Sequence, residues 1–150
     1  MIQYVRGNLF QSGCEGLVNT VNTKGVMGAG LARQFKSHFP RMFADYKRMC
    51  DLGQFKTGLV TCHRETWNSN PVWVINFPTK DDWRDPSRLE YIDTGLKDLK
   101  RAIRSTGIQS IAVPPLGTGL GGLGWPTVKA LIEQHLEGLT DVRVLVYEPI

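Results

Sequence analysis

The chain alternates between segments with the apolar spacing of helices and segments with that of strands. Residues 30–39 place Leu31, Phe35 and Phe39 on one face of a helix, and Pro40 ends that pattern before a second helical segment. Further helices are expected over residues 86–105 and 126–137. Strands are expected at residues 2–6, 16–22, 58–65, 72–77, 110–115 and 141–148.

This alternation predicts one α/β domain over residues 1–150, built on a mixed, largely parallel sheet. Residues 72–77 are apolar on both faces, which is typical of a strand buried in the middle of such a sheet. No repeat or linker interrupts the chain. Ligands of parallel sheets bind beyond the carboxyl ends of the strands, so we expect functional residues directly after the strands.

The composition, 41% hydrophobic and 21% charged residues, is typical of a soluble globular protein. No signal pattern begins the chain and no apolar run approaches the ~20 residues of a membrane span, so we expect a cytoplasmic protein that does not enter a membrane. Cys14, Cys50 and Cys62 lack the C-x-x-C spacing, and the three histidines are scattered. We therefore expect free thiols, no metal site and no cofactor.

The net charge of +4 is concentrated in one segment. Residues 31–57 carry six basic and two acidic side chains, an excess equal to that of the whole chain. Such an excess suits a polyanion such as nucleic acid. A solvated helix surface explains the same charges without any partner.

Glycines cluster in two segments that each follow an expected strand and begin an expected helix. The first glycine loop, residues 22–32, contains three glycines, and the second glycine loop, residues 113–125, contains five. Backbone N–H groups without neighbouring side chains can line a cleft at a helix N-terminus, where a diphosphate is favoured. Tight turns that require positive φ are the alternative.

The second glycine loop also contains the G-x-G-x-x-G pattern, at Gly117, Gly119 and Gly122. That pattern fits an NAD-dependent oxidoreductase. Only one helix and one strand follow it, however, which leaves too little chain for a substrate domain. Asn19 precedes the first glycine loop and Asn22 begins it, and both offer amides either to ribose hydroxyls or to a turn.

Five stretches together resemble the macrodomain family, whose members bind ADP-ribose and in some cases remove it from modified targets. They are VRGNLF, LVNTVNTKGVMGAGLARQF, INFPTKDDWRDPSRLEYI, PPLGTGLGGLGW and VLVYEP. The chain looks most like the DNA ADP-ribosyl glycohydrolase branch, the antitoxins of DNA-ADP-ribosylating toxins, with the human terminal ADP-ribose protein glycohydrolase as a relative. The resemblance implies a three-layer α/β/α fold.

The resemblance also implies where ADP-ribose binds. Residues 26–31 would hold the distal ribose and residues 116–121 the diphosphate, while Asn8 stands where many macrodomains carry the aspartate that receives the adenine amino group. Tyr147 would lie against the adenine or, alternatively, in the core. The expected contacts are Asn8, Leu9, Thr20, Asn22, Val26, Met27, Gly28, Ala29, Gly30, Leu31, Pro115, Leu116, Gly117, Thr118, Gly119, Leu120, Gly121 and Tyr147.

Lys80 ends the stretch NFPTK, directly after the expected buried strand. Most lysines at such a point reach for solvent, but the catalytic lysine of the branch falls at the matching place, so the resemblance assigns catalysis to Lys80. A partly buried lysine presents some neutral amine, which attacks an anomeric carbon or moves a proton. The human relative adds an acid from its second glycine loop. The matching position here is Gly121, and the nearest carboxylates are those of Asp81, Asp82 and Asp85.

Trp83 and Arg84 are the expected DNA contacts, because an exposed tryptophan beside arginines can stack on a single-stranded base. Packing over a loop is the alternative for Trp83. The leading hypothesis is a monomeric glycohydrolase that removes ADP-ribose from thymidine in single-stranded DNA, as antitoxin to a cognate DNA ADP-ribosyltransferase toxin. The alternatives are a hydrolase of ADP-ribose on protein carboxylates and a reader that binds ADP-ribose without cleaving it.

Overall fold

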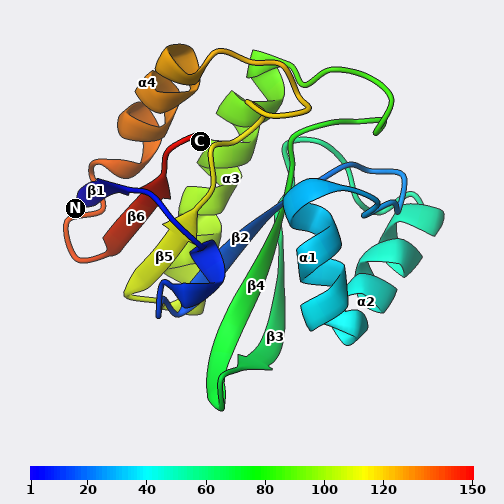
Figure 1. The fold of residues 1–150 in the computed structure, drawn as a ribbon, viewed down its shortest axis with the longest axis horizontal. Helices are drawn as coiled ribbons and strands as arrows, with labels where there is room; N and C mark the ends of the chain where they lie inside the picture. The colour runs from blue at the N-terminus through cyan, green and yellow to red at the C-terminus, as the bar shows by residue number, and fades with distance from the viewer.

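A six-stranded sheet separates two layers of helices (Figure 1). The computed structural model describes residues 1–150. The strands are β1 (Ile2–Val5), β2 (Gly16–Val21), β3 (Thr61–Trp67), β4 (Asn70–Pro78), β5 (Ser110–Val113) and β6 (Arg143–Tyr147). The helices are α1 (Gly30–His38), α2 (Pro40–Asp51), α3 (Leu89–Thr106) and α4 (Trp125–Leu136), and a short 3-10 turn spans Leu9–Gln11.

The strand order is β1-β6-β5-β2-β4-β3, and every neighbouring pair is parallel except β3 with β4. The antiparallel pair is a hairpin that turns at Asn68 and Ser69, both at positive φ. β3 starts three residues later than expected, because Gly58 lies in a turn at φ +85°. The prediction of a three-layer α/β/α fold with a mixed, largely parallel sheet is confirmed.

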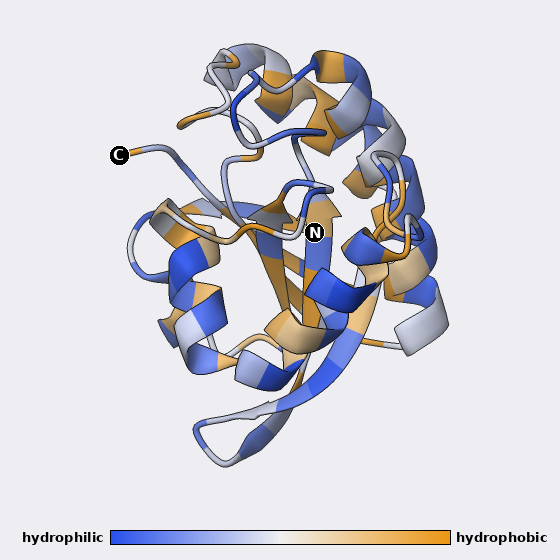
Figure 2. Ribbon diagram, turned by 90° about the vertical axis from the view of Figure 1, so that its right-hand side faces the viewer, coloured by the Kyte–Doolittle hydropathy of each residue, from blue (hydrophilic) through white to orange (hydrophobic).

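Alternate residues of the strands contribute to two separate cores. In β6, Val144 and Val146 belong to the core under α3 and α4, whereas Leu145 and Tyr147 belong to the core under α1 and α2. Successive side chains of a strand point to opposite faces, so a sheet covered on both faces requires apolar residues at every position. Figure 2 shows these hydrophobic strands in the interior, between helices whose outer sides are hydrophilic.

The helices bury one face each. In α3, Ile92, Leu96, Leu99 and Ile103 are buried at helical spacing, within the helix that the sequence predicted over residues 86–105. No helix combines the length and the apolar character that crossing a bilayer requires.

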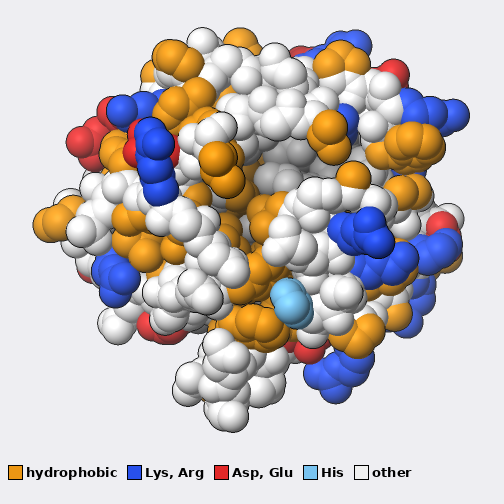
Figure 3. Space-filling view, in the orientation of Figure 1, with side chains coloured by type: hydrophobic (Ala, Val, Ile, Leu, Met, Phe, Trp, Pro, Cys, Tyr) orange, Lys and Arg blue, Asp and Glu red, His pale blue; other side chains and the backbone are white.

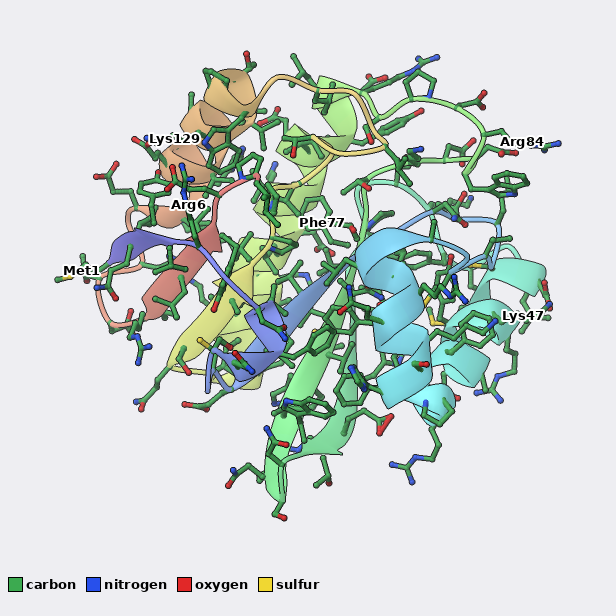
Figure 4. The ribbon with its side chains drawn as sticks, viewed as in Figure 1. Met1, Arg6, Lys47, Phe77, Arg84 and Lys129 are labelled. Carbon is green, nitrogen blue, oxygen red and sulfur yellow. The ribbon has the colours of Figure 1, made fainter.

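Gly95 allows α3 to lie close to β4. The ring of Phe77, a fully buried residue of β4 that Figure 4 labels near the centre of the molecule, occupies the space that a side chain on Gly95 would need. Glycine costs helix stability of about 1 kcal/mol relative to alanine, so its place in mid-helix has a packing reason. The contact holds α3 against the carboxyl-terminal half of β4, which leads to Lys80.

Candidate active site

A cleft of about 530 Å³ opens beyond the carboxyl ends of β2, β4 and β5. The first glycine loop, the segment that follows β4 and the second glycine loop form its walls. Figure 3 shows the hollow in the upper middle of the face that it presents. Its volume is typical of sites that enclose a small organic ligand.

The cleft brings together most of the site residues that the sequence suggested. They are Thr20, Asn22, Val26, Gly28, Ala29, Gly30, Leu31, Lys80, Trp83, Pro115, Gly117, Gly119, Leu120 and Gly121. The lining also includes Val21, Ala32, Thr79 and Pro114, which sequence reasoning missed although each is adjacent in the chain to a residue that it named. Lys80 is the only ionisable side chain of the whole lining.

Hydrogen bonds from Asn22 shape the first glycine loop. Its side-chain Oδ1 accepts from the N–H of Lys24 at 2.9 Å, and its Nδ2 donates to the carbonyl of Val26 at 2.7 Å. The hydroxyl of Tyr46, on α2, lies 2.8 Å from the main-chain oxygen of Asn22 and 3.0 Å from Oδ1. Burial raises the pKa of Tyr46, so the hydroxyl remains protonated and able to donate. Nothing in the sequence indicated this role of Tyr46.

Both glycine loops of the cleft contain lining residues whose main-chain N–H groups donate to no protein group. α1 begins at Gly30 without a side-chain cap, which leaves the N–H groups of its first turn, including Leu31 and Ala32, without an acceptor in the protein. In the second glycine loop, the N–H groups of Leu120 and Gly121 also donate to no protein group. Such a set of bare donors, one part of it at a helix N-terminus, is suited to a diphosphate.

Gly121 has no room for a side chain. A Cβ at this position would collide with the hydroxyl of Ser87 and with the carbonyl of Gly117. The N–H of Ser87 donates to the carbonyl of Gly121 at 3.0 Å, which holds the loop against the segment before α3. The loop therefore passes too close to its neighbours to carry a carboxylate at position 121.

The backbone at the end of β4 sets the position of Lys80. The N–H groups of Thr79 and Lys80 both approach the carbonyl of Val21, at 2.9 and 3.4 Å, so the chain stays beside β2 beyond the last strand residue. The Lys80 side chain is half-buried at the mouth of the cleft. Its Nζ donates to the carbonyl of Trp83 at 3.3 Å.

The carboxylates that follow Lys80 are occupied elsewhere. Asp81 accepts from the hydroxyl of Thr23 at 2.6 Å. Asp82 accepts from Arg84 at 2.8 and 3.0 Å, and these hydrogen bonds hold the pKa of Asp82 well below its usual range. Asp85 is exposed and does not line the cleft. No carboxylate therefore lies in the cleft as a partner for Lys80.

Comparison with known proteins identifies the fold and its loops. Residues 18–132 match the family model of the Macro domain. The chain belongs to the macrodomain family. This macrodomain is 49% identical over its whole length to a DNA ADP-ribosyl glycohydrolase of Thermus aquaticus and covers 42% of that protein. The chain thus spans less than half the length of this curated relative.

Two solved structures are close to this macrodomain. The macrodomain of Mycobacterium tuberculosis DarG superposes with a TM-score of 0.96 at 46% identity, covering 100% of this chain and 99% of that one. Thermosipho africanus DarTG in complex with ADP-ribose superposes with a TM-score of 0.92 at 33% identity, covering 99% of this chain and 42% of that one. The family resemblance found in the sequence is confirmed.

Three suggested contacts lie within the glycine loops but do not line the cleft. Met27 and Leu116 are buried beneath the loop surface. The hydroxyl of Thr118 donates back to the carbonyl of Pro115 at 2.9 Å. Met27 and Leu116 therefore pack beneath the loops, and the Thr118 hydroxyl stabilises the turn of the second loop. In a short loop, successive side chains cannot all point toward the cleft.

Three more suggested contacts lie outside the cleft, near the end of β1 and β6. The Asn8 side chain accepts from the N–H of Phe10 at 2.9 Å and so caps the turn Leu9–Gln11. Leu9 is buried, and Tyr147 belongs to the core under α1 and α2 with 9% of its surface exposed. In the structure these residues make packing and capping contacts, and their contact with ADP-ribose stays a prediction.

Trp83 and Arg84 lie differently with respect to the cleft. Trp83 lines its mouth with 51% of its surface exposed. The Arg84 guanidinium lies 5.5 Å from the Trp83 ring centroid, is bonded to Asp82 and does not line the cleft. Figure 4 shows Arg84 extending outward from the loop into solvent.

Proposed function

We propose that this macrodomain hydrolyses the bond between ADP-ribose and thymidine in single-stranded DNA. The observation that carries the proposal is the composition of the cleft: bare main-chain donors on two walls, and one ionisable side chain, Lys80, at the mouth. The Thermus aquaticus relative bears the name DNA ADP-ribosyl glycohydrolase, and the Thermosipho africanus structure holds ADP-ribose. Both support this assignment.

The donors of the two glycine loops would hold the diphosphate, which leaves the distal ribose toward Lys80. The bond between the anomeric carbon and the base nitrogen breaks with its electron pair passing to the base, which takes up a proton. Water supplies the hydroxyl that ends on the anomeric carbon, so free ADP-ribose is released and the DNA keeps its thymidine unmodified. Lys80 either bonds transiently to the anomeric carbon or carries the proton. The diphosphate contacts draw the ribose toward an oxocarbenium-like state.

The biological role that we propose is that of an antitoxin. A relative from Thermosipho africanus, 31% identical, is a fusion of a DNA ADP-ribosyl transferase with a DNA ADP-ribosyl glycohydrolase. We infer that a transferase and a glycohydrolase fused in one chain add and remove the same modification. We therefore propose a cognate DNA ADP-ribosyltransferase as the toxin whose product this macrodomain removes in the cytoplasm.

The test compares release of ADP-ribose from ADP-ribosylated thymidine DNA and from glutamate-ADP-ribosylated protein. Lys80→Ala and the charge-conserving Lys80→Arg are expected to lower release from DNA by about 10²–10⁴-fold, while calorimetry shows that ADP-ribose still binds. Lys129→Ala, on α4 away from the cleft, is the control and should match the wild type.

Three other outcomes would each overturn a different part of the proposed function. Full turnover by Lys80→Ala would remove Lys80 from the chemistry. Wild-type protein that binds ADP-ribose but leaves both substrates intact would be a reader. Faster release from protein than from DNA would favour the carboxylate-directed hydrolase.

A further inference from the structure

Three exposed apolar side chains surround the mouth of the cleft. Val26, Trp83 and Leu120 come from three separate segments, and 38%, 51% and 78% of their respective surfaces are exposed. Apolar side chains gathered at the mouth of a cleft are typical of a binding surface rather than of a solvated loop. When ADP-ribose occupies the cleft, a nucleoside joined to it would extend out of the cleft beside these three side chains.

Most basic side chains of α2, of the first glycine loop and of the segment between β4 and α3 form ion pairs with acidic neighbours. The pairs are Lys47 with Asp51, Arg48 with Asp45, Arg84 with Asp82, Arg88 with Glu90, Lys24 with Asp81 and Arg41 with Glu65. Arg33 and Lys36, both on α1, have no acidic partner. Of the six basic side chains of residues 31–57, Arg33, Lys36 and Lys56 therefore have no acidic partner, and the first two form one unpaired stripe on α1.

This stripe starts at the cleft itself. The first turn of α1, including Leu31 and Ala32, lines the cleft, and Arg33 is the next residue. Arg33 and Lys36 are both exposed and three residues apart, so they share one face of the helix and lie about 4.5 Å apart along its axis. The Lys36 Nζ lies 4.4 Å from the ring centroid of Phe43 on α2, which directs it along the surface. Figure 3 shows Lys and Arg side chains over α1 and α2, beside the hollow.

We propose that α1 carries the DNA strand that flanks the modified nucleotide, with backbone phosphates on Arg33 and Lys36. The three apolar side chains at the mouth then surround the modified nucleoside. This inference rests on the proposed function and names the part of the substrate outside the cleft. It follows that flanking DNA contributes binding that a single modified nucleoside lacks, and that this contribution depends on salt.

The experiment measures kcat/KM for ADP-ribosylated thymidine as a mononucleoside and within a single-stranded oligonucleotide. Each phosphate contact on a single strand adds ~0.7 to the slope of log K against log salt, so two contacts give roughly a sevenfold fall between about 50 and 200 mM salt. The double variant Arg33→Gln/Lys36→Gln should lose that part of the salt dependence, so its deficit against the wild type on the oligonucleotide should shrink about sevenfold between about 50 and 200 mM salt. Its rate on the mononucleoside should stay at the wild-type value.

The control is Lys97→Gln/Lys100→Gln on α3, which packs on the opposite face of the sheet. These two lysines have the same spacing and no acidic partner, so the variant removes the same charge at a remote place. It should keep the wild-type salt dependence. Equal effects of the two double variants, or none from Arg33→Gln/Lys36→Gln, would overturn the inference.

Binding of an unmodified single-stranded oligonucleotide, measured by fluorescence anisotropy, separates this inference from the proposed function. If the wild type released nothing from either substrate while oligonucleotide binding still required Arg33 and Lys36, the proposed reaction would fail and the surface would stand. If the mononucleoside were hydrolysed while oligonucleotide binding did not depend on these residues, the reaction would stand and the surface would fail.

Discussion

Tyr46→Phe removes one hydroxyl that holds the first glycine loop from below. Tyr46 is 1% exposed, and its hydroxyl is the donor closest to the main-chain oxygen of Asn22, at 2.8 Å. The Asn22 side chain keeps its bond from the N–H of Lys24 in the variant, but the main-chain oxygen loses its donor. An acceptor left buried without a donor costs about 1–3 kcal/mol.

We expect the free energy of unfolding to fall by about 2 kcal/mol, which lowers Tm by roughly 4–8 °C in a domain of this size. Part of this free energy is lost from the loop conformation itself, because the lost hydrogen bond is accepted by Asn22, the first residue of the loop. Each 1.4 kcal/mol lost by the loop conformation weakens binding about tenfold. Urea unfolding and calorimetric titration with ADP-ribose measure the two effects.

Tyr4→Phe is the matched control. The Tyr4 hydroxyl, on β1, donates to Glu133 of α4 at 2.7 Å, and neither residue lines the cleft. This variant should lose stability without any change in ADP-ribose affinity. Unchanged affinity in Tyr46→Phe, or an equal loss of affinity in Tyr4→Phe, would refute the assignment of Tyr46 to the loop.

The second glycine loop and a half-buried histidine give two further predictions. Gly121→Ala should weaken ADP-ribose binding and lower Tm, because its Cβ would collide with Ser87 and Gly117. Gly124→Ala is the control and should do neither, because nothing lies within 4 Å of a Cβ at that position. Similar titrations and melting curves for the two variants would contradict this prediction. Burial lowers the pKa of His63 in the folded protein, so the unfolded chain binds the His63 proton more readily than the folded protein does. The stability that the neutral imidazole contributes above about pH 6.5 is therefore lost as the pH falls. His63→Gln should therefore flatten the decline of unfolding free energy between pH 7.5 and 5, and an unchanged slope would exclude His63 as its source.

The elements and the two cores of this macrodomain could be predicted because their signals are local. Apolar residues recur every three or four positions in α3 and at successive positions in β4, and these periods define a helix face and a strand buried on both sides. The parallel strands place the segments that leave them at one edge, which is why the glycine loops could be named in advance, whereas the role of Lys80 came from the family resemblance.

The sequence by itself thus determined the layers, the glycine-rich walls and the position of Lys80 after a buried strand. Only the tertiary structure decided that Arg84 is hydrogen-bonded to Asp82 and that the Tyr46 hydroxyl donates to Asn22. It also decided that Ser87 leaves no room for a side chain at Gly121. The tertiary structure decided as well that Arg33 and Lys36 have no acidic partner while the basic residues of α2 are paired. The physical reason is that periodicity reports which face of an element is buried, whereas a hydrogen bond or a close contact depends on how elements distant in the chain are packed together.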